Sequence, residues 1–484
     1  MNKEVSTNNN QQSKRAKARW AILRKALLQS NSTSNSTTHD GSIIKQGSDT
    51  NIRNGDDELA ATYSIHRFQG FNVFKRSILV DTDINLKYDN TDDYYELAEY
   101  EIPIMTTRNN NHASTMIKIR TREKTFNVGR KVSIKDLMSH VYYGVDNTGN
   151  TRVWNCSNVL AHLVTCPLSL PSSWNDTDDG RKNKPVPFVG LSHILSLSQK
   201  SLISGMHRLR VIELGAGMAA LPSLSLAAIS LSKTRNKYIK ENMPFMDIVI
   251  TDGHPNSVEN NLINAKLTFD LYDEQNIKKG EKVNGITDDN SNSNRIDCIY
   301  SNSSCSIQCT QLLWKANDQG SKECLSLLKT NQQQPNDFFD LVLVSDCTHF
   351  TECHAGLIAT IGRLLRVHGV CLLCQPMRGN TLDQFIEMVQ DINNNACNLH
   401  SENENCTISQ QQKSLFDLNL YWNYDEHICR QHKIYSMGNK GDKVYDENIH
   451  RPLVLVLKKL RDYNEDIDTP IAMKHSLKRE AKRV

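Results

Sequence analysis

Two glycines follow an apolar run in the middle of the chain, and acidic residues lie before and after them. Gly215 and Gly217 come directly after Leu209–Leu214. Such a turn lets a ligand approach the backbone closely, and the next helix offers it unpaired N–H groups. Glu213 lies where a cationic ligand is favoured and a pyrophosphate is not. Asp252 ends the next strand, where a carboxylate can accept both hydroxyls of a ribose. These residues predict a site for S-adenosylmethionine and suit a dinucleotide less well; a plain tight turn is the alternative.

Two further positions belong to the same pocket if the strands around them form one sheet. Trp314 would close a third short strand, Thr310–Trp314, where a flat ring can lie beside adenine; a core or cap tryptophan is the alternative. Ser345 and Asp346 end a later strand, above the crevice in which open α/β sheets bind their ligands. An aspartate at this place is seldom structural, although it can also cap the helix that follows.

The elements that must position these residues follow from the spacing of apolar residues. Short continuous runs predict strands, and runs with helical period predict helices. The predicted strands are Leu209–Leu214, Met246–Thr251, Phe339–Ser345, Gly369–Gln375 and Pro452–Leu457, and the helices are Met218–Leu231, Asn256–Leu267, Gly356–Leu365 and Thr381–Val389. Short apolar strands separated by helices indicate a mostly parallel sheet covered on both faces. We therefore predict a doubly wound α/β fold.

Changes in composition divide the chain into five parts. The predicted parts are a basic amphipathic helix at 1–29, a disordered polar linker at 30–57, a smaller α/β accessory region at 58–150 with Ile65–Phe68 and Met116–Arg120 as its clearest strands, the α/β domain at 151–460 with polar inserts near 273–309 and 392–414, and a basic tail at 461–484. The first helix carries six basic residues and no acid over Ser13–Leu28. This pattern is typical of a calmodulin target or a membrane-surface helix, and equally of a helix packed on the catalytic domain.

Composition and charge argue against several classes of function. The 57 lysines and arginines nearly balance the 54 acids, which leaves a net charge of +3 and no indication of a nucleic-acid partner. No apolar run approaches the ~20 residues of a spanning helix, so we expect no membrane partner and a cytoplasmic protein, with the nucleus as a further location. Thirteen scattered cysteines indicate free thiols in a reducing compartment. The closely spaced Cys347, His349, Cys353 and His354 fit no standard zinc pattern, so no metal is expected.

Several runs of the sequence are more specific than the glycine turn. The most specific are Arg378-Gly379-Asn380-Thr381 and the two tyrosine–aspartate–glutamate runs that begin at Tyr424 and Tyr445. Further matching runs are Ala18–Leu28, Phe71-Asn72-Val73-Phe74, Asn147–Asn150 with Trp154, Glu213–Met218, Thr251-Asp252-Gly253 and Ser345-Asp346-Cys347. In these runs the chain resembles the calmodulin-lysine N-methyltransferases, a branch of the seven-β-strand class I protein methyltransferases.

The resemblance implies a seven-stranded sheet, six strands parallel and the last antiparallel, in a methyltransferase domain at 151–460. It also implies transfer of methyl groups from S-adenosylmethionine to a lysine of calmodulin. Carried over by position, the cofactor contacts would be Trp154, Gly215, Ala216, Gly217, Asp252, Trp314 and Ser345, with Asp346 facing the substrate lysine. Asp346 would orient the amine or accept its proton through water.

The sequence departs from the family at two positions, and these departures keep alternatives open. Asn155 follows Trp154 where the family usually has proline, and His349 stands where related enzymes often have another aromatic residue. One alternative is methylation of a different protein lysine. Another is a non-catalytic module that binds calmodulin or another protein and has a decayed pocket. The side chain of Arg378 could meet an acidic substrate or belong to a structural loop.

Overall fold

The computed structural model describes twelve stretches of the chain, and the account below is limited to them. They are residues 70–79, 95–104, 115–124, 153–165, 208–232, 245–277, 299–301, 305–315, 319–327, 338–401, 414–437 and 445–470. The predicted helix at 1–29, the linker at 30–57, the run Ile65–Phe68 and the basic residues 474–483 lie outside them.

One large sheet forms the centre of the molecule, with strand order β10-β11-β9-β8-β4-β5-β7-β6. Its parallel strands are β4 (Arg208–Leu214), β5 (Phe245–Asp252), β7 (Cys305–Gln311), β8 (Phe339–Ser345) and β9 (Leu365–Gln375). β11 (Leu453–Lys459) runs antiparallel to β9, and β10 (Phe416–Tyr421) antiparallel to β11, so β10 shares the direction of β9. These seven strands confirm the predicted fold; β6 (Ile299–Ser301) adds a short antiparallel strand at one edge.

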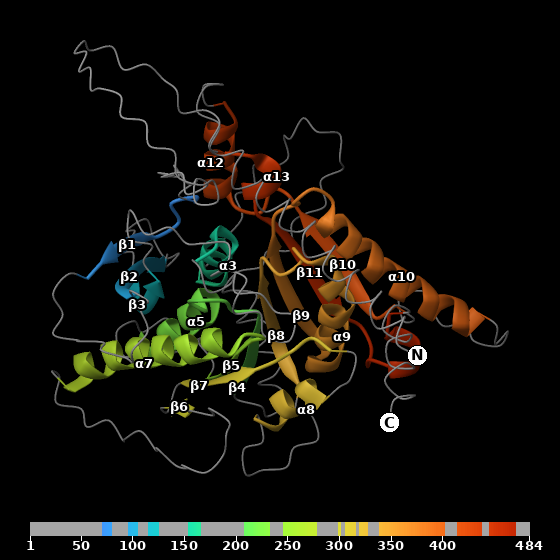
Figure 1. Cartoon of the computed structure of the whole chain (residues 1–484), viewed down its shortest axis with the longest axis horizontal. Coiled ribbons are helices and arrows are strands. Elements are labelled where there is room, and N and C mark those ends of the chain that lie inside the picture. The colour runs from blue at the N-terminus through green and yellow to red at the C-terminus, as the bar shows by residue number, and fades with distance from the viewer. Residues whose placement is uncertain are drawn as a thin grey trace, which may run out of the picture.

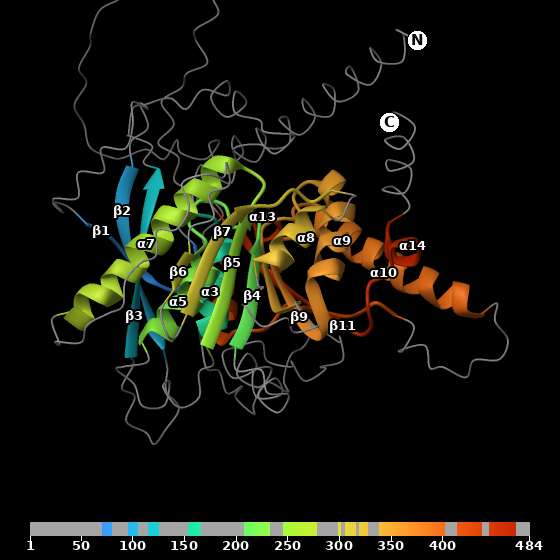
Figure 2. The same ribbon diagram turned by 90° about the horizontal axis from the view of Figure 1, so that it is seen from below.

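Helices cover both faces of this sheet, and a second sheet lies outside one of the helical layers (Figure 1). On one side lie α3 (Asn155–Thr165), α5 (Leu221–Leu231) and α7 (Pro255–Ile277); on the other lie α8 (Gln319–Ser326), α9 (His354–Leu364) and α10 (Thr381–Ser401). The outer sheet is antiparallel, with β1 (Lys75–Ile78), β2 (Tyr95–Ile104) and β3 (Thr115–Lys124) packed on α5 and α7 (Figure 2). None of the described helices is both long and apolar enough to cross a membrane.

Burial between two sheets explains the composition of α5. All eleven residues of this helix are buried, and its sequence is apolar apart from Ser223, Ser225 and Ser230. A helix that is apolar on all sides is stable in water only where neighbours cover every face. The hydroxyl of Ser225 donates to Leu221 O at 2.6 Å, which provides a partner for one buried polar group inside the helix itself. The accessory sheet is therefore needed to cover the helix that follows the glycine turn.

The structure corrects several predicted boundaries. The strand predicted at Thr310–Trp314 lies earlier, at Cys305–Gln311, so residues 305–309 do not belong to the polar insert near 273–309. Cys305, Ile307 and Cys309 are buried, whereas the polar residues between them point outward and concealed the strand in the sequence. α7 and α10 extend beyond their predicted ends into both polar inserts, and β10 was not predicted. The described part of the accessory region is an antiparallel sheet, and the domain boundaries themselves stay a prediction.

Side chains of α7 bind the open edge of β3 in place of another strand. They are spaced by four residues along the helix: Asn260, Asn264, Thr268 and Tyr272. The N–H of Arg122 donates to Asn264 Oδ1 at 2.7 Å, and Asn260 Nδ2 donates to the Arg122 carbonyl at 3.0 Å. Because this edge is buried, its backbone groups need such partners. These contacts fix the accessory sheet to the central domain.

We predict that Asn264→Ala lowers the free energy of unfolding by about 1–3 kcal/mol, because it removes the side chain that accepts from the buried N–H of Arg122. Urea denaturation of the purified protein measures this effect. Glu259→Ala, on the exposed face of the same helix, is the control and should change stability by less than about 0.5 kcal/mol. Equal effects of the two substitutions would contradict the role given to Asn264.

Candidate active site

The glycine loop connects β4 to α5 and is held against the end of β5. Gly215 and Gly217 have φ of 65° and 64°, a backbone conformation that residues with a side chain adopt at an energetic cost. A Cβ on Gly215 would lie 2.6 Å from the sulfur of Cys347 and 3.1 Å from the ring of Trp314, so only glycine fits. The N–H of Ala216 donates to the Thr251 carbonyl at 2.9 Å. The loop is therefore fixed in position. Because two of its residues are glycines, no side chain at these positions covers the backbone.

Three asparagines of α7 bind the carbonyl groups of this loop. Asn261 Nδ2 donates to Gly217 O at 2.9 Å, and Met218 O accepts from Asn260 Nδ2 at 2.6 Å and from Asn264 Nδ2 at 3.0 Å. Sequence reasoning missed these residues. The available signal was the presence of four asparagines, poor helix formers, within one predicted helix, Asn256–Leu267. Asn260 and Asn264 also bind β3, so one pair of side chains holds both the accessory sheet and the glycine loop.

The two acidic residues beside the loop bind its backbone and that of the following helix. Glu213 is fully buried, and its Oε2 accepts from the N–H of Ser223 in the first turn of α5 at 3.0 Å. Burial raises the pKa of Glu213 to about 7. Asp252 accepts from the N–H of Gly217 and from the N–H of His254, each at 2.8 Å, and burial raises its pKa. The side chain of Ser257 also hydrogen-bonds to Asp252. A carboxylate has about four lone-pair sites, so Asp252 can still accept from a further donor.

Trp314 lies beyond the end of β7, with its ring against Gly215 and its backbone against α9. A Cβ on Gly356, in the first turn of α9, would lie 2.2 Å from the Trp314 carbonyl oxygen. The indole Nε1 is buried and has no hydrogen-bond partner among the described residues. Trp314 is thus a packed side chain, as the alternative had it, and its ring lies directly against Gly215 of the glycine loop.

Asp346 forms a bidentate ion pair with Arg378. The carboxylate lies directly after β8, and the guanidinium comes from the turn between β9 and α10. Arg378 Nε and Nη2 donate to the two carboxylate oxygens at 2.9 and 2.6 Å. The side chains are only 9% and 15% exposed, so water screens the pair weakly. For Arg378 the sequence allowed either contact with an acidic substrate or a place in a structural loop. In the structure it pairs with Asp346, the predicted catalytic residue.

Three other groups hold Arg378 in place. Its guanidinium carbon lies 5.3 Å from the ring centroid of Trp154, in cation–π geometry. Asn448, in α13 (Glu447–His450), accepts from the N–H of Arg378 through its carbonyl at 2.7 Å and from the N–H of Gly379 through Oδ1 at 3.0 Å. Arg378 has φ of 45° and Asp346 has φ of 55°, so both partners adopt a strained backbone. Trp154 thus contributes to the site through its contact with Arg378 and not through Asp346 directly.

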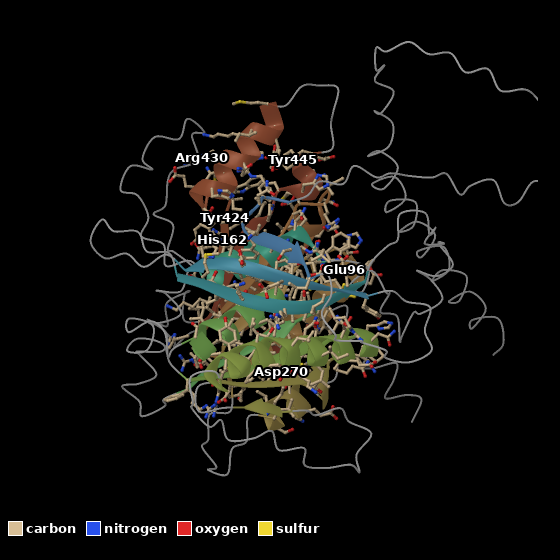
Figure 3. The ribbon with its side chains drawn as sticks, turned by 90° about the vertical axis from the view of Figure 1, so that its left-hand side faces the viewer. Glu96, His162, Asp270, Tyr424, Arg430 and Tyr445 are labelled. Carbon is tan, nitrogen blue, oxygen red and sulfur yellow. The ribbon has the colours of Figure 1, made fainter. Side chains whose placement is uncertain are left out.

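The run that begins at Tyr424 leads into α12 (Glu426–Met437), and Figure 3 shows Tyr424 close to His162 of α3. Tyr424 is buried and its hydroxyl donates to Pro452 O at 2.7 Å. Asp425 accepts from the N–H of Ile428 at 2.9 Å and lies 3.1 Å from Nε2 of His162 in α3. Burial opposes ionisation of Asp425, but His162 holds its pKa below the usual value. This motif has a structural role, because it joins α12 to α3.

The cysteines and histidines after β8 point in different directions. The thiol of Cys347 points to the carbonyls of Leu214 and Gly215, whereas His354 Nε2 lies 2.8 Å from the Thr348 carbonyl on the other side. Across the described residues, no three His, Cys, Asp or Glu side chains converge as ligands for a metal ion. The ring of His349 lies beside Phe350, with centroids 4.5 Å apart.

Most of the predicted site residues meet at one edge of the central sheet. The glycine loop, Asp252, Trp314 and Ser345 come from the ends of four parallel strands or just beyond them. A nucleoside fits what is there: a loop backbone without large side chains, the lone pairs of Asp252 and the indole N–H. Contact between these residues and a cofactor stays a prediction.

We predict that Gly356→Ala weakens binding of S-adenosylhomocysteine at least about tenfold, a change of ~1.4 kcal/mol. The new Cβ would displace the Trp314 backbone, and with it the ring beside Gly215. Isothermal titration calorimetry measures the affinity. Gly362→Ala is the matched control in the same helix, since its Cβ would lie 2.4 Å from the ring of Tyr463, which belongs to the C-terminal segment. Equal loss of affinity in both variants would show that Trp314 is not responsible.

We predict that Glu213→Gln changes how stability depends on pH. With the folded-state pKa at about 7 and the usual value near 4.5, folding takes up a proton between these pH values. Glu213 therefore stabilises the protein fully below pH ~4.5, and this contribution is lost as the pH rises through 7, by up to about 3 kcal/mol. The variant should gain stability relative to wild type from pH 5 to pH 8 in urea denaturation.

The exposed Glu387→Gln is the control and should show no such gain. If the free energy of unfolding depended on pH in the same way in Glu213→Gln and in wild type, the prediction would be contradicted.

Solved structures of similar proteins are distant in sequence. A TehB-like SAM-dependent methyltransferase from Corynebacterium glutamicum is 11% identical, with 54% of this chain and 87% of that chain covered and a TM-score of 0.23. A putative class I S-adenosylmethionine-dependent methyltransferase from Listeria monocytogenes is 10% identical, with 56% and 59% covered and a TM-score of 0.26. The fold assignment rests on the strand order described above and not on these scores.

Two sequence matches are more informative. The chain is 24% identical over 318 residues to a calmodulin-lysine N-methyltransferase of Arabidopsis thaliana, a match that covers 65% of this chain. It spans 66% of that relative, just under two thirds of its length. Residues 306–392, which include Trp314, Ser345, Asp346 and Arg378, match a family described as lysine methyltransferase. Both matches confirm the predicted resemblance.

Proposed function

We propose that this protein is a protein-lysine N-methyltransferase that uses S-adenosylmethionine, and that calmodulin is its substrate. The observation that carries the proposal is the buried pair of Asp346 and Arg378 at the edge of the sheet where the glycine loop lies. Both residues belong to the stretch that matches the lysine methyltransferase family. Calmodulin is supported more narrowly, by the name of one relative at 24% identity.

The residues that would hold the cofactor follow from the site. The backbone of Gly215, Ala216 and Gly217 would face the ligand, and Asp252 would accept hydrogen bonds from ribose hydroxyls. Trp314 and Ser345 would border the base, and Trp154 would close the site from α3. When bound, S-adenosylmethionine supplies a methyl group activated by its sulfonium.

The task of the protein is then to align a lysine amine with that methyl group, which is largely a matter of position. The amine must be unprotonated to attack, although the free lysine pKa is near ~10.4. A largely buried site favours the uncharged amine, because burial destabilises the ammonium form. Asp346 can accept a hydrogen bond from the amine on a lone pair that Arg378 leaves open, and so fix its direction.

We predict that the purified protein transfers tritiated methyl groups to purified calmodulin, with mass spectrometry locating the product on a lysine. Asp346→Asn should lower turnover at least about 100-fold while S-adenosylhomocysteine affinity changes less than about threefold, because Asp346 belongs to the substrate side. Asp468→Asn is the matched control: Asp468 is fully buried and paired with Arg461 away from the glycine loop, and its loss should leave turnover per folded molecule unchanged.

The outcomes separate the competing hypotheses. Methyl transfer only to other proteins of a lysate would retain the enzyme and refute calmodulin as the substrate. Cofactor binding without transfer to any protein would favour the non-catalytic module. Loss of cofactor binding together with turnover in Asp346→Asn would move this residue to the cofactor side.

A further inference from the structure

We infer that Arg378 is a positioning residue that neutralises the charge of Asp346, so that a lysine amine beside this carboxylate can lose its proton. The inference rests on the proposed function and assigns a role to a residue that the resemblance did not include among the site residues. Arg378 acts through Asp346 and needs no contact with the reacting atoms.

The geometry of the pair matches this role. The two hydrogen bonds of 2.9 and 2.6 Å engage both carboxylate oxygens, as the planar fork of an arginine allows and the single ammonium of a lysine does not. Arginine stays protonated at every pH that the protein tolerates, so the pair has no net charge. Burial opposes the charge on Arg378, but Asp346 raises the pKa of the guanidinium above its usual value.

A carboxylate without this partner would work against methyl transfer. An opposite charge within about 4–6 Å favours the charged form of an ionisable group by about 1–3 pKa units. A bare Asp346 would therefore stabilise the ammonium form of the substrate lysine, which has no lone pair to attack the methyl carbon. With Arg378 in place, the carboxylate can still accept a hydrogen bond from the amine and no longer holds its proton electrostatically.

The other ionisable groups around the pair do not take over this function. Cys156 of α3 faces it beside Cys374 of β9, and burial raises the pKa of the Cys156 thiol, which keeps it neutral. Cys347 follows Asp346, and burial, with Asp252, Asp346 and Glu213 nearby, raises the pKa of its thiol as well. Tyr424, just before α12, is buried near both Cys374 and Cys156 and has a raised pKa.

The charged side chain of Glu447, next to Asn448, interacts with other residues and not with the pair of Asp346 and Arg378. Glu447 of α13 lies 2.6 Å from Arg451 and 3.6 Å from His432. Among the interactions of Asp346 in the described part of the chain, Arg378 is thus the cation that balances its charge.

The fold holds Arg378 in this position at an energetic cost. The residue adopts φ of 45°, its N–H is bound by Asn448, and its guanidinium lies over Trp154. Asp346 is strained too, with φ of 55°. Strained residues persist where the surrounding structure fixes them, and they concentrate at functional sites. Both residues of the pair are strained, and Trp154 and Asn448 support it from two other parts of the fold. This indicates that the reaction requires the pair, since an incidental surface contact would not need such support.

The test is the pH profile of kcat for methyl transfer, measured with Arg378→Gln at saturating substrate, because kcat reports the ionisable groups of the enzyme–substrate complex. We expect the rising limb of the profile to move up by about 1–3 pH units, which lowers the rate at neutral pH by about 10–1000-fold and restores much of it at high pH. Arg378→Lys keeps the positive charge and should leave the profile within about half a unit of wild type, with a lower plateau. The same profile for Gln and wild type, or the same shift for Lys and Gln, would overturn the inference.

Two further variants keep the test decisive if Arg378→Gln folds poorly. The double variant with Asp346→Asn and Arg378→Gln has no unpaired buried charge, and its profile should return to within about half a unit of wild type at a reduced plateau. If Arg378 had only a structural role, the pH profile would not depend on the charge at position 378. Arg461→Gln, which breaks the bidentate pair with Asp468 away from the glycine loop, is the matched control and should not move the profile.

If the wild-type protein methylates no protein lysine, the proposed function fails and this inference fails with it. If the wild-type protein is active and the profile of Arg378→Gln is not shifted, only the inference is refuted.

Discussion

The ion pair of Asp346 and Arg378 is the interaction on which the arrangement of the site depends. Removing an arginine and a carboxylate from water is costly, and the pair persists only because both oxygens and both donors are matched. Its partners follow β8 and β9, so the register of these two strands decides whether they meet. Trp154 and Asn448 complete the support from the start of α3 and from α13. The motif that begins at Tyr445 thus has a structural role, because it supplies Asn448, which fixes the arginine turn.

A second constraint acts on the other half of the site, where the glycine loop must stay open without being mobile. Its backbone carbonyls are bound by asparagines of α7, and its N–H groups by Thr251 O and Asp252. Asn260 and Asn264 bind the edge of β3 with the same side chains. The accessory sheet therefore buries α5, completes the hydrogen bonding of α7 and stabilises the loop.

The sequence was most informative where one local rule decides the structure. Continuous apolar runs located Phe339–Ser345 to the residue and β4, β5 and β9 to within a few residues. β7 was predicted too late in the sequence, because its outward positions carry serine and glutamine and its first residues do not look apolar. β10 escaped because four of its six residues are only partly buried or exposed, which weakens the alternation of a strand. The pairing of Arg378 with Asp346 depends on contacts between residues 32 positions apart, and no pattern within either segment encodes it.

Charge on the accessory sheet bears on how an acidic protein would approach. The basic residues of this sheet are largely matched by acids across the strands: Lys75 with Glu101, Arg76 with Glu96 and Glu123, and Lys118 and Arg120 with Glu99. Cross-strand pairs of this kind reduce the field that a distant anion would experience. Attraction of an acidic substrate to this face is therefore weak despite its many lysines and arginines. Recognition of an acidic protein by this face would therefore depend on shape and hydrogen bonds more than on long-range charge.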